Sequence, residues 1–273
     1  MKLFSLHSRH FIVTGAAGLL GIQHCRAILQ NQGIPVLIDI SKDSLNQTVM
    51  KLEKEFNLKI PNYLCDITKE NDLKSVSSSL KEKKIKIFGL INNAAINPST
   101  DQSNIKKNFT RFENFELKQW ELELSVSLTG SMLCSKVFSE LLLANDIPGV
   151  ILNISSDLGL IAPNQNLYKK DSLQDYEQPV KPVTYSVIKT GLIGLTRYIS
   201  TYFEGKIRSN AICPGGVRNN QSKDFIEKLE NLIPIKRMAE KEDFMGLIVF
   251  LLSDASSYIN GAVIPIDGGR TAW

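Results

Sequence analysis

The sequence predicts an α/β protein: one doubly wound domain spanning residues 1–273, with a parallel sheet of about seven strands and helices on both faces. Two observations support this fold class. Short apolar segments alternate with amphipathic segments along nearly the whole chain, as repeated βα units require. The first apolar segment also runs through a glycine-rich turn into a helix. Because no repeat, low-complexity tract or linker interrupts the pattern, we expect no second domain.

The first half of the chain shows the alternation most regularly. Val-, Ile- and Leu-rich segments that end in polar residues read as strands, and the amphipathic segments between them read as helices. The predicted strands are 10–14, 34–39, 62–65 and 85–92, and the predicted helices follow Gly21 and cover 42–56 and 69–82. A polar loop at 96–116 has no periodicity and is predicted to form a rim of the site.

The second half continues the pattern with one large irregularity. A long helix is predicted at 117–144, a strand at 149–155, a helix at 183–204 and a strand at 207–213. Helices at 222–231 and 240–252 precede a last strand within 261–269. The 157–184 segment is a polar insertion, and an insertion of this length beside a candidate site is more often functional than not. We therefore interpret it as a substrate loop.

Composition excludes several classes of function. Apolar residues make up 43% and charged residues 22% of the 273-residue chain, as in a globular protein. The net charge of +4 comes from dispersed lysines, so no nucleic-acid partner is expected. No stretch approaches the ~20 apolar residues of a membrane span. The four cysteines lie far apart without metal-ligand spacing, which predicts buried free thiols, no metal site and a cytoplasmic protein.

The glycine turn and the acid after the second strand point to a dinucleotide. Backbone without side chains between Gly15 and Gly21 can approach a pyrophosphate at a helix N-terminus, although a plain tight turn has the same signature. Asp39, 18 residues after Gly21, is positioned to accept hydrogen bonds from ribose hydroxyls and to repel a 2′-phosphate. No arginine follows it. We therefore expect NAD(H) rather than NADP(H).

Tyr185 and Lys189 form the candidate proton-transfer pair. Residues four apart on a helix share one face, so the phenol and the ammonium point into the same space. A nearby cation lowers the pKa of a tyrosine from its free value of about 10 and lets it exchange a proton with an alcohol or ketone. Taken alone, the same spacing also fits a solvated helix face.

The ordered set of motifs resembles the short-chain dehydrogenase/reductase family, which has a Rossmann-type fold and binds NAD(P). These motifs run in sequence over essentially the full length: Thr14-Gly15, Asn92-Asn93-Ala94, Ser155-Ser156, Tyr185-x-x-x-Lys189, Pro214-Gly215 and Asp267-Gly268-Gly269. Within the family, the set is also similar to a sub-branch associated with flagellin modification and surface-sugar biosynthesis.

The resemblance implies a role for each matching residue. Ser156 would bind the substrate oxygen, Tyr185 would be the general acid/base, and Lys189 would lower the pKa of Tyr185 and hold the nicotinamide ribose. Ser127 stands where the family has an Asn whose carbonyl supports a proton-relay water. The expected cofactor-binding residues are Gly15, Ala17, Gly18, Leu20, Gly21, Asp39, Ile40, Asp66, Ile67, Asn93, Ala94, Tyr185, Lys189, Pro214, Gly215 and Val217.

Three departures from the family pattern keep alternatives open. Leu19 replaces the middle glycine of the usual turn, and the resulting spacing of Gly15, Gly18 and Gly21 resembles that of sugar-nucleotide epimerases and dehydratases. Ser127 in place of Asn puts the helix kink and the relay water in doubt. The 29 positions from Ser156 to Tyr185 exceed the spacing in shorter members of the family, so the substrate loop has been rebuilt.

The function expected from these patterns is NAD(H)-dependent interconversion of an alcohol and a ketone. The substrate would be small and polar, such as a sugar or sugar phosphate of surface-glycan biosynthesis, with lysines 169, 170 and 181 of the insertion meeting phosphate or hydroxyls. Alternatives are an epimerase or dehydratase that retains NAD, a 3-oxoacyl-type reductase and a non-catalytic NAD-binding regulator. The resemblance also implies a homodimer or homotetramer.

Overall fold

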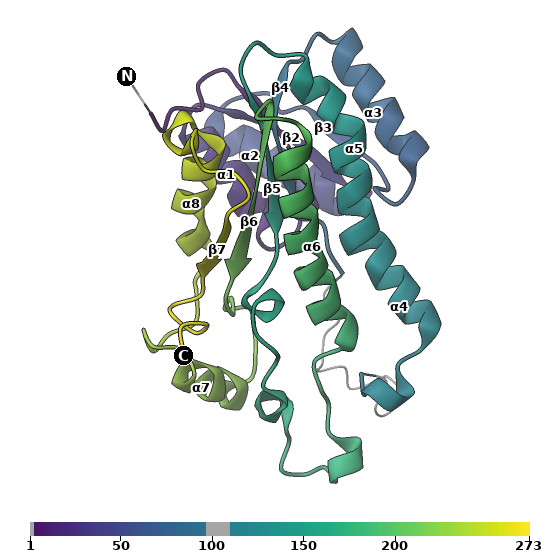
Figure 1. Cartoon of the computed structure of the whole chain (residues 1–273), viewed down its shortest axis with the longest axis vertical. Helices are drawn as coiled ribbons and strands as arrows, with labels where there is room; N and C mark the ends of the chain where they lie inside the picture. The colour runs from purple at the N-terminus through teal and green to yellow at the C-terminus, as the bar shows by residue number, and fades with distance from the viewer. Residues whose placement is uncertain (1–2, 97–109) are drawn as a thin grey trace.

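The computed structural model describes residues 3–96 and 110–273 and confirms the doubly wound α/β fold (Figure 1). Among these residues, seven parallel strands form one sheet in the order β3-β2-β1-β4-β5-β6-β7. They are β1 (His10–Thr14), β2 (Ile34–Asp39), β3 (Asn62–Leu64), β4 (Ile87–Asn92), β5 (Gly149–Ile154), β6 (Ile207–Pro214) and β7 (Val263–Ile266). Most of the predicted rim loop, residues 97–109, lies outside the described part of the chain.

The α-helices follow the predicted positions. They are α1 (Gly21–Gln30), α2 (Lys42–Phe56), α3 (Glu70–Glu82), α4 (Leu117–Leu124), α5 (Gly130–Leu143), α6 (Val183–Tyr202), α7 (Lys223–Asn231) and α8 (Met245–Leu252). Local chemistry explains the ends of α2, where the Ser41 side chain accepts a hydrogen bond from the Ser44 amide and Asn57 closes the helix in the left-handed region at φ 50°.

Three predicted elements differ from the observed ones. The predicted helix at 117–144 is two α-helices joined by a π-helical turn, Ser125–Thr129. The predicted helix at 240–252 begins as a 3₁₀ turn, Lys241–Phe244. The 157–184 insertion contains three short 3₁₀ turns, Asp157–Gly159, Gln165–Tyr168 and Asp175–Glu177, because its polar side chains hydrogen-bond to nearby backbone.

Two apolar cores fill the space between the sheet and its helices. On one face, α1, α2 and α8 bury side chains such as Ile28, Leu52 and Leu251 against the strands. On the other face, α3 and α5 bury Leu73, Phe138 and their neighbours, with Ile199 of α6 in the same cluster. The predicted helices on both faces of the sheet are thereby confirmed, and the four cysteines are buried free thiols as expected.

The expectation that no stretch approaches a membrane span needs one correction, because the segment Leu117–Leu143 is long and apolar enough to cross a membrane by length and composition. Half of its most apolar window is buried inside the protein, however, and α5 packs against α3 and β4. We therefore interpret it as a core helix.

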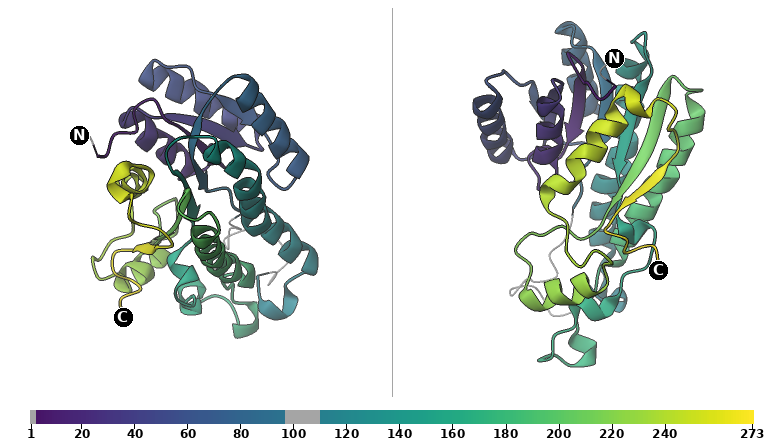
Figure 2. Two further views of the ribbon diagram at one scale, coloured as in Figure 1. Left: turned by 45° about the horizontal axis from the view of Figure 1, so that its top comes forward. Right: turned by 90° about the vertical axis from the view of Figure 1, so that its left-hand side faces the viewer.

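The sheet order fixes where a ligand would bind. The chain moves outward from β1 through β2 to β3, then returns to place β4 on the other side of β1. At such a reversal, the loops after the two strands diverge and leave a crevice at the carboxyl edge. Below this edge, α7 and the 157–182 segment lie beside each other (Figures 1 and 2) and share a small apolar cluster that includes Leu167 and Leu229.

Lowering the pH from 7 to 4 should destabilise the protein through His24, which is fully buried on α1. Burial lowers the pKa of His24 to about 4, and a contact with Asn93 offsets only part of this effect. In the unfolded chain a histidine has a pKa of about 6.5, so the unfolded state binds the extra proton between these values. The free energy of unfolding should therefore fall by about 3 kcal/mol as the pH drops through this window.

Urea unfolding at pH 7, 6, 5 and 4 measures this dependence. His24→Leu should reduce the change in the free energy of unfolding between pH 7 and pH 4. The control His7→Leu, at an exposed position, should show the same change as the wild type. Parallel curves for His24→Leu and the wild type would contradict the assignment.

Candidate active site

The glycine turn after β1 is held tightly against the loop after β4. Gly15 has φ +60°, and a Cβ there would lie 2.8 Å from the Cα of Ala94. The Thr14 hydroxyl accepts hydrogen bonds from the amides of Asn93 and Ala94, each at 3.1 Å. The Asn93 side chain returns two hydrogen bonds of 3.0 Å to the carbonyls of Thr14 and Gly15. These contacts leave bare backbone at the crevice, which fits a pyrophosphate.

Asp39 lies at the end of β2, next to the same turn. Its carboxylate accepts hydrogen bonds of 3.0 Å from the amides of Ala17 and Ser41. Ile40 beside it is 68% exposed. Ile67, in contrast, is buried in the core, where its side chain packs against Gly130. Of the expected adenosine contacts, Asp39 therefore lies against the glycine turn and Ile40 is exposed, whereas the Ile67 side chain is buried in the core.

Ser156 follows β5 and is buried beside Asp157. Its hydroxyl donates a 2.8 Å hydrogen bond to Oδ1 of Asp157, and the amide of Leu158 donates to both side chains. Oδ2 of Asp157 accepts a 2.5 Å hydrogen bond from Arg270, and both members of this ion pair are buried. The ion pair fixes Asp157 and through it the Ser156 hydroxyl.

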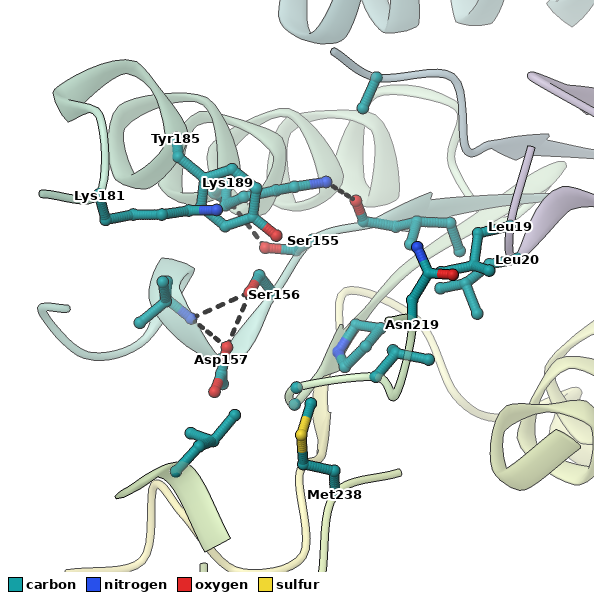
Figure 3. Close-up of a pocket in the computed structure, with 18 of the residues that line it drawn as sticks. Leu19, Leu20, Ser155, Ser156, Asp157, Lys181, Tyr185, Lys189, Asn219 and Met238 are labelled. Atoms are coloured by element: carbon teal, nitrogen blue, oxygen red, sulfur yellow. Dashed lines mark hydrogen bonds between the residues drawn. The ribbon is translucent and has the colours of Figure 1, made fainter. Parts of the chain in front are cut away.

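Tyr185 and Lys189 extend from α6 toward Ser156 (Figure 3). The Lys189 ammonium donates a 2.8 Å hydrogen bond to the carbonyl of Ile154 and lies 5.7 Å from the centroid of the Tyr185 ring. A second ammonium, that of Lys181, lies closer, at 3.7 Å from the same centroid. The phenol therefore has two cations beside it.

The expected lowering of the Tyr185 pKa by Lys189 stays a prediction, because burial acts on the same phenol in the opposite direction. Burial raises the pKa of Tyr185 above its usual value, although a hydrogen bond with Ser156 opposes this shift. Burial and, to a smaller extent, the charge of Lys181 lower the pKa of Lys189 to about 8. Tyr185, Lys181 and Lys189 share one cavity that is partly shielded from water. Loss of solvation there has a larger effect on the pKa values of Tyr185 and Lys189 than the attraction between phenolate and ammonium.

Ser127 lies in the π-helical turn between α4 and α5. Its hydroxyl accepts a 3.2 Å hydrogen bond from the amide of Ile96, and its carbonyl accepts a 2.8 Å bond from the Ser131 hydroxyl. The irregular helix at this place is therefore a π-helical turn that forms without the Asn. The Ser127 carbonyl already has one donor, so a relay water would share it.

These elements enclose a cavity of about 380 Å³. Eleven of the predicted site residues line it: Gly15, Gly18, Leu20, Asn93, Ala94, Ser156, Tyr185, Lys189, Pro214, Gly215 and Val217. Seven do not line it: Ala17, Gly21, Asp39, Ile40, Asp66, Ile67 and Ser127. Gly21 has a steric task instead, since a Cβ there would lie 2.1 Å from the carbonyl oxygen of Gly15.

Sequence reasoning missed part of the wall. Asp157 and Arg270 both line the cavity. Asp157 directly follows Ser155-Ser156 and Arg270 directly follows Asp267-Gly268-Gly269, so their positions next to these motifs could have identified them. Several further lining side chains come from the insertion and the region of α7, where no motif marks them: Leu167, Tyr168, Asn219, Gln221, Phe225, Leu229 and Met238. Among the described residues, no group of three or more His, Cys, Asp or Glu side chains is placed to hold a metal ion.

Gly21→Ala should damage the turn far more than Gly18→Ala. The new Cβ at position 21 meets backbone of Gly15 and Ala16, whereas at position 18 it meets only the Gly15 oxygen at 3.1 Å. We expect Gly21→Ala to lower the free energy of unfolding by about 1–3 kcal/mol or more and to weaken NADH binding at least about tenfold. Gly18→Ala should cost under about 1 kcal/mol. Urea unfolding and calorimetry measure both effects, and equal behaviour of the two variants would contradict the close approach.

Comparison with known proteins gives full-length matches. The family model described as enoyl-(acyl carrier protein) reductase matches residues 15–271. Post-translational flagellin modification protein A of Campylobacter coli is 31% identical over 97% of this chain and 98% of its own. The 3-oxoacyl-[acyl-carrier-protein] reductase FabG of Thermotoga maritima is 27% identical over 97% and 98%. NADP-dependent mannitol dehydrogenase of Hypocrea jecorina is 28% identical over 99% and 95%.

Solved structures match equally well. A short chain dehydrogenase from Leptospira borgpetersenii with bound NAD⁺ superposes with a TM-score of 0.82 at 27% identity, over 98% of this chain and 94% of that one. The family model and the relatives cover the glycine turn, the Ser156–Tyr185–Lys189 set and the carboxyl-terminal strand together. The chain therefore belongs to the short-chain dehydrogenase/reductase family of oxidoreductases, as its motifs predicted.

Proposed function

We propose that this oxidoreductase uses NAD(H) to interconvert an alcohol and a ketone on a small polar substrate. A sugar or sugar phosphate of surface-glycan biosynthesis is the proposed substrate class. The observation that carries the proposal is that Ser156, Tyr185 and Lys189 line one cavity with the glycine turn. The names of two relatives, a flagellin modification protein and a mannitol dehydrogenase, support the choice of a carbohydrate.

The side chains divide the proposed chemistry among them. When bound, the nicotinamide would accept or supply a hydride. The Ser156 hydroxyl, positioned by Asp157, would form a hydrogen bond with the substrate oxygen, and Tyr185 would exchange a proton with that oxygen. General acid/base catalysis of this kind contributes about 10²–10⁴-fold, and the rest would come from positioning.

Tyr185 must ionise for this role even though burial raises its pKa. Protonated lysines near the ring favour the phenolate, since an opposite charge within about 4–6 Å stabilises the ionised form. Two ammonium groups lie 3.7 and 5.7 Å from the ring centroid. We propose that Lys181 and Lys189 together oppose the effect of burial.

The preference for NAD(H) rests on Asp39. Its carboxylate stands next to the glycine turn, where it would accept ribose hydroxyls and repel a 2′-phosphate. Related proteins do not decide the matter, because one relative is named NADP-dependent and one solved structure holds NAD⁺.

Three other functions have specific support. The spacing of Gly15, Gly18 and Gly21 favours an epimerase or dehydratase that retains NAD. The family model's description and the Thermotoga relative favour a reductase of 3-oxoacyl groups. The loss of Asn at position 127 favours a regulator that binds NAD without turnover. Net NADH production from a polyol would argue against all three.

Assembly and compartment stay predictions. A homodimer or homotetramer would cover exposed apolar side chains of α5 and α6 such as Met132, Tyr198 and Tyr202, which are 40%, 63% and 62% exposed. The cytoplasm is the proposed compartment because the four cysteines are free thiols.

Tyr185→Phe should abolish turnover while retaining most of the affinity for the cofactor. The substitution removes the hydroxyl that moves the proton but keeps the ring that packs in the cavity. With a substrate found by screening polyols, sugar acids and sugar phosphates, we expect kcat to fall at least about 10²-fold. The affinity for NADH should change by less than about threefold. Absorbance at the NADH band and calorimetry measure the two quantities, and unchanged kcat would refute the role of Tyr185.

A further inference from the structure

Lys181 occupies a position in the cavity that the family motifs do not describe. It belongs to the 157–184 insertion and precedes α6 by two residues. Its side chain crosses the face of Tyr185 (Figure 3), and its ammonium stops 3.7 Å from the ring centroid. Lys169 and Lys170, the other insertion lysines once considered for the site, are exposed and do not line the cavity.

Among the residues that the structure describes, positive charge exceeds negative charge in the cavity wall. The charged lining residues in this part of the chain are Asp157, Lys181, Lys189 and Arg270, which give three cations and one carboxylate. The carboxylate is already held by Arg270 and by the Ser156 hydroxyl. Lys189 donates to the carbonyl of Ile154. Lys181 lies on the side of the cavity that the insertion forms.

Among the described residues, the carboxylates of Asp157 and Glu123 favour the charged form of Lys181, and each also accepts hydrogen bonds from other side chains. Asp157 and the buried Glu123 of α4 oppose the lowering of the Lys181 pKa, which burial brings to about 8. Glu123 accepts a hydrogen bond from Gln119 at 2.6 Å and a second one from Thr184. An anion that enters the cavity would be attracted to the Lys181 ammonium. This attraction is stronger than it would be in water, because the site is partly desolvated.

We propose that Lys181 binds an anionic group of the substrate, a carboxylate or a phosphate ester, and so selects acidic sugars over neutral polyols. The geometry gives the reason: the substrate oxygen must meet the hydroxyls of Tyr185 and Ser156, and Lys181 covers the same ring. A substituent near the reacting carbon therefore reaches the ammonium. This inference rests on the proposed alcohol–ketone function and names its substrate class.

A simpler role for Lys181 is to act only on Tyr185. A cation stacked on a phenol is attracted to its ring and favours its ionised form. That role would make Lys181 matter equally for every substrate. Selectivity between matched charged and neutral ligands therefore separates the two roles.

The test compares ligands that differ at one group. D-Gluconate and D-sorbitol differ only at C1, and D-sorbitol 6-phosphate adds a phosphate to D-sorbitol. Calorimetry measures their binding to the Tyr185→Phe protein with and without NADH, so that no turnover occurs. Lys181→Met, Lys181→Arg and the control Lys169→Met, which changes an exposed lysine of the same insertion, are made in that background.

We expect at least one of the two anions to bind at least about tenfold more tightly than sorbitol. Lys181→Met should weaken that anion's binding by about 10- to 100-fold and change sorbitol binding by less than about threefold. Lys181→Arg should retain most of the affinity, and Lys169→Met all of it. The anion that loses affinity identifies the group as carboxylate or phosphate.

Three results would overturn the proposal: no measurable binding of either anion at millimolar concentration, equal binding of anions and sorbitol, or an equal loss for both in Lys181→Met. Failure of the oxidoreductase function looks different. In that case the Lys181-dependent anion binding would persist, but the wild type would produce no NADH from any member of the ligand panel.

Discussion

The link between Thr14 and the loop after β4 is the contact on which the site depends. The Thr14 hydroxyl accepts two amide hydrogen bonds from Asn93 and Ala94, and Asn93 returns two hydrogen bonds to the turn. These bonds join β1 and β4 at the point where the strand order reverses. The glycine turn thereby exposes bare backbone at the crevice, and the end of β5 and helix α6 bring the catalytic candidates to the same place.

Burial then sets the chemistry of that crevice. A phenol and two ammonium groups share a cavity of about 380 Å³. Desolvation favours the neutral form of each group, so it raises the pKa of Tyr185 and lowers the pKa values of Lys181 and Lys189. The buried pair of Asp157 and Arg270 links the end of β5 to the carboxyl terminus of the chain. Such a pair contributes little net stability, but breaking it would leave an uncompensated charge beside Ser156. We interpret it as the support that fixes the serine.

Much of the fold and part of the site could be predicted from the sequence. The bounds of β2 and α2 were predicted correctly, and in the structure Ser41 and Asn57 fix the two ends of α2 by local chemistry. The grouping of Ser156, Tyr185 and Lys189 followed from motif order. The stacking of Lys181 on Tyr185 could not be predicted, since Lys181 precedes Pro182 in a loop whose path depends on tertiary contacts. The Asp157–Arg270 pair spans 113 residues, and the rise of the Tyr185 pKa depends on depth of burial, which spacing does not reveal.

The central claim is that this crevice binds NAD(H) and that Asp39 selects it over NADP(H). Calorimetric titration with NAD⁺, NADH, NADP⁺ and NADPH tests this claim most directly. The measurement requires no knowledge of the substrate. In the wild type, NADH should bind at least about tenfold more tightly than NADPH, because the carboxylate accepts ribose hydroxyls and repels a 2′-phosphate. In Asp39→Ala the difference should shrink to within about threefold. Tighter binding of NADPH by the wild type, or no binding of any of the four nucleotides, would contradict the account.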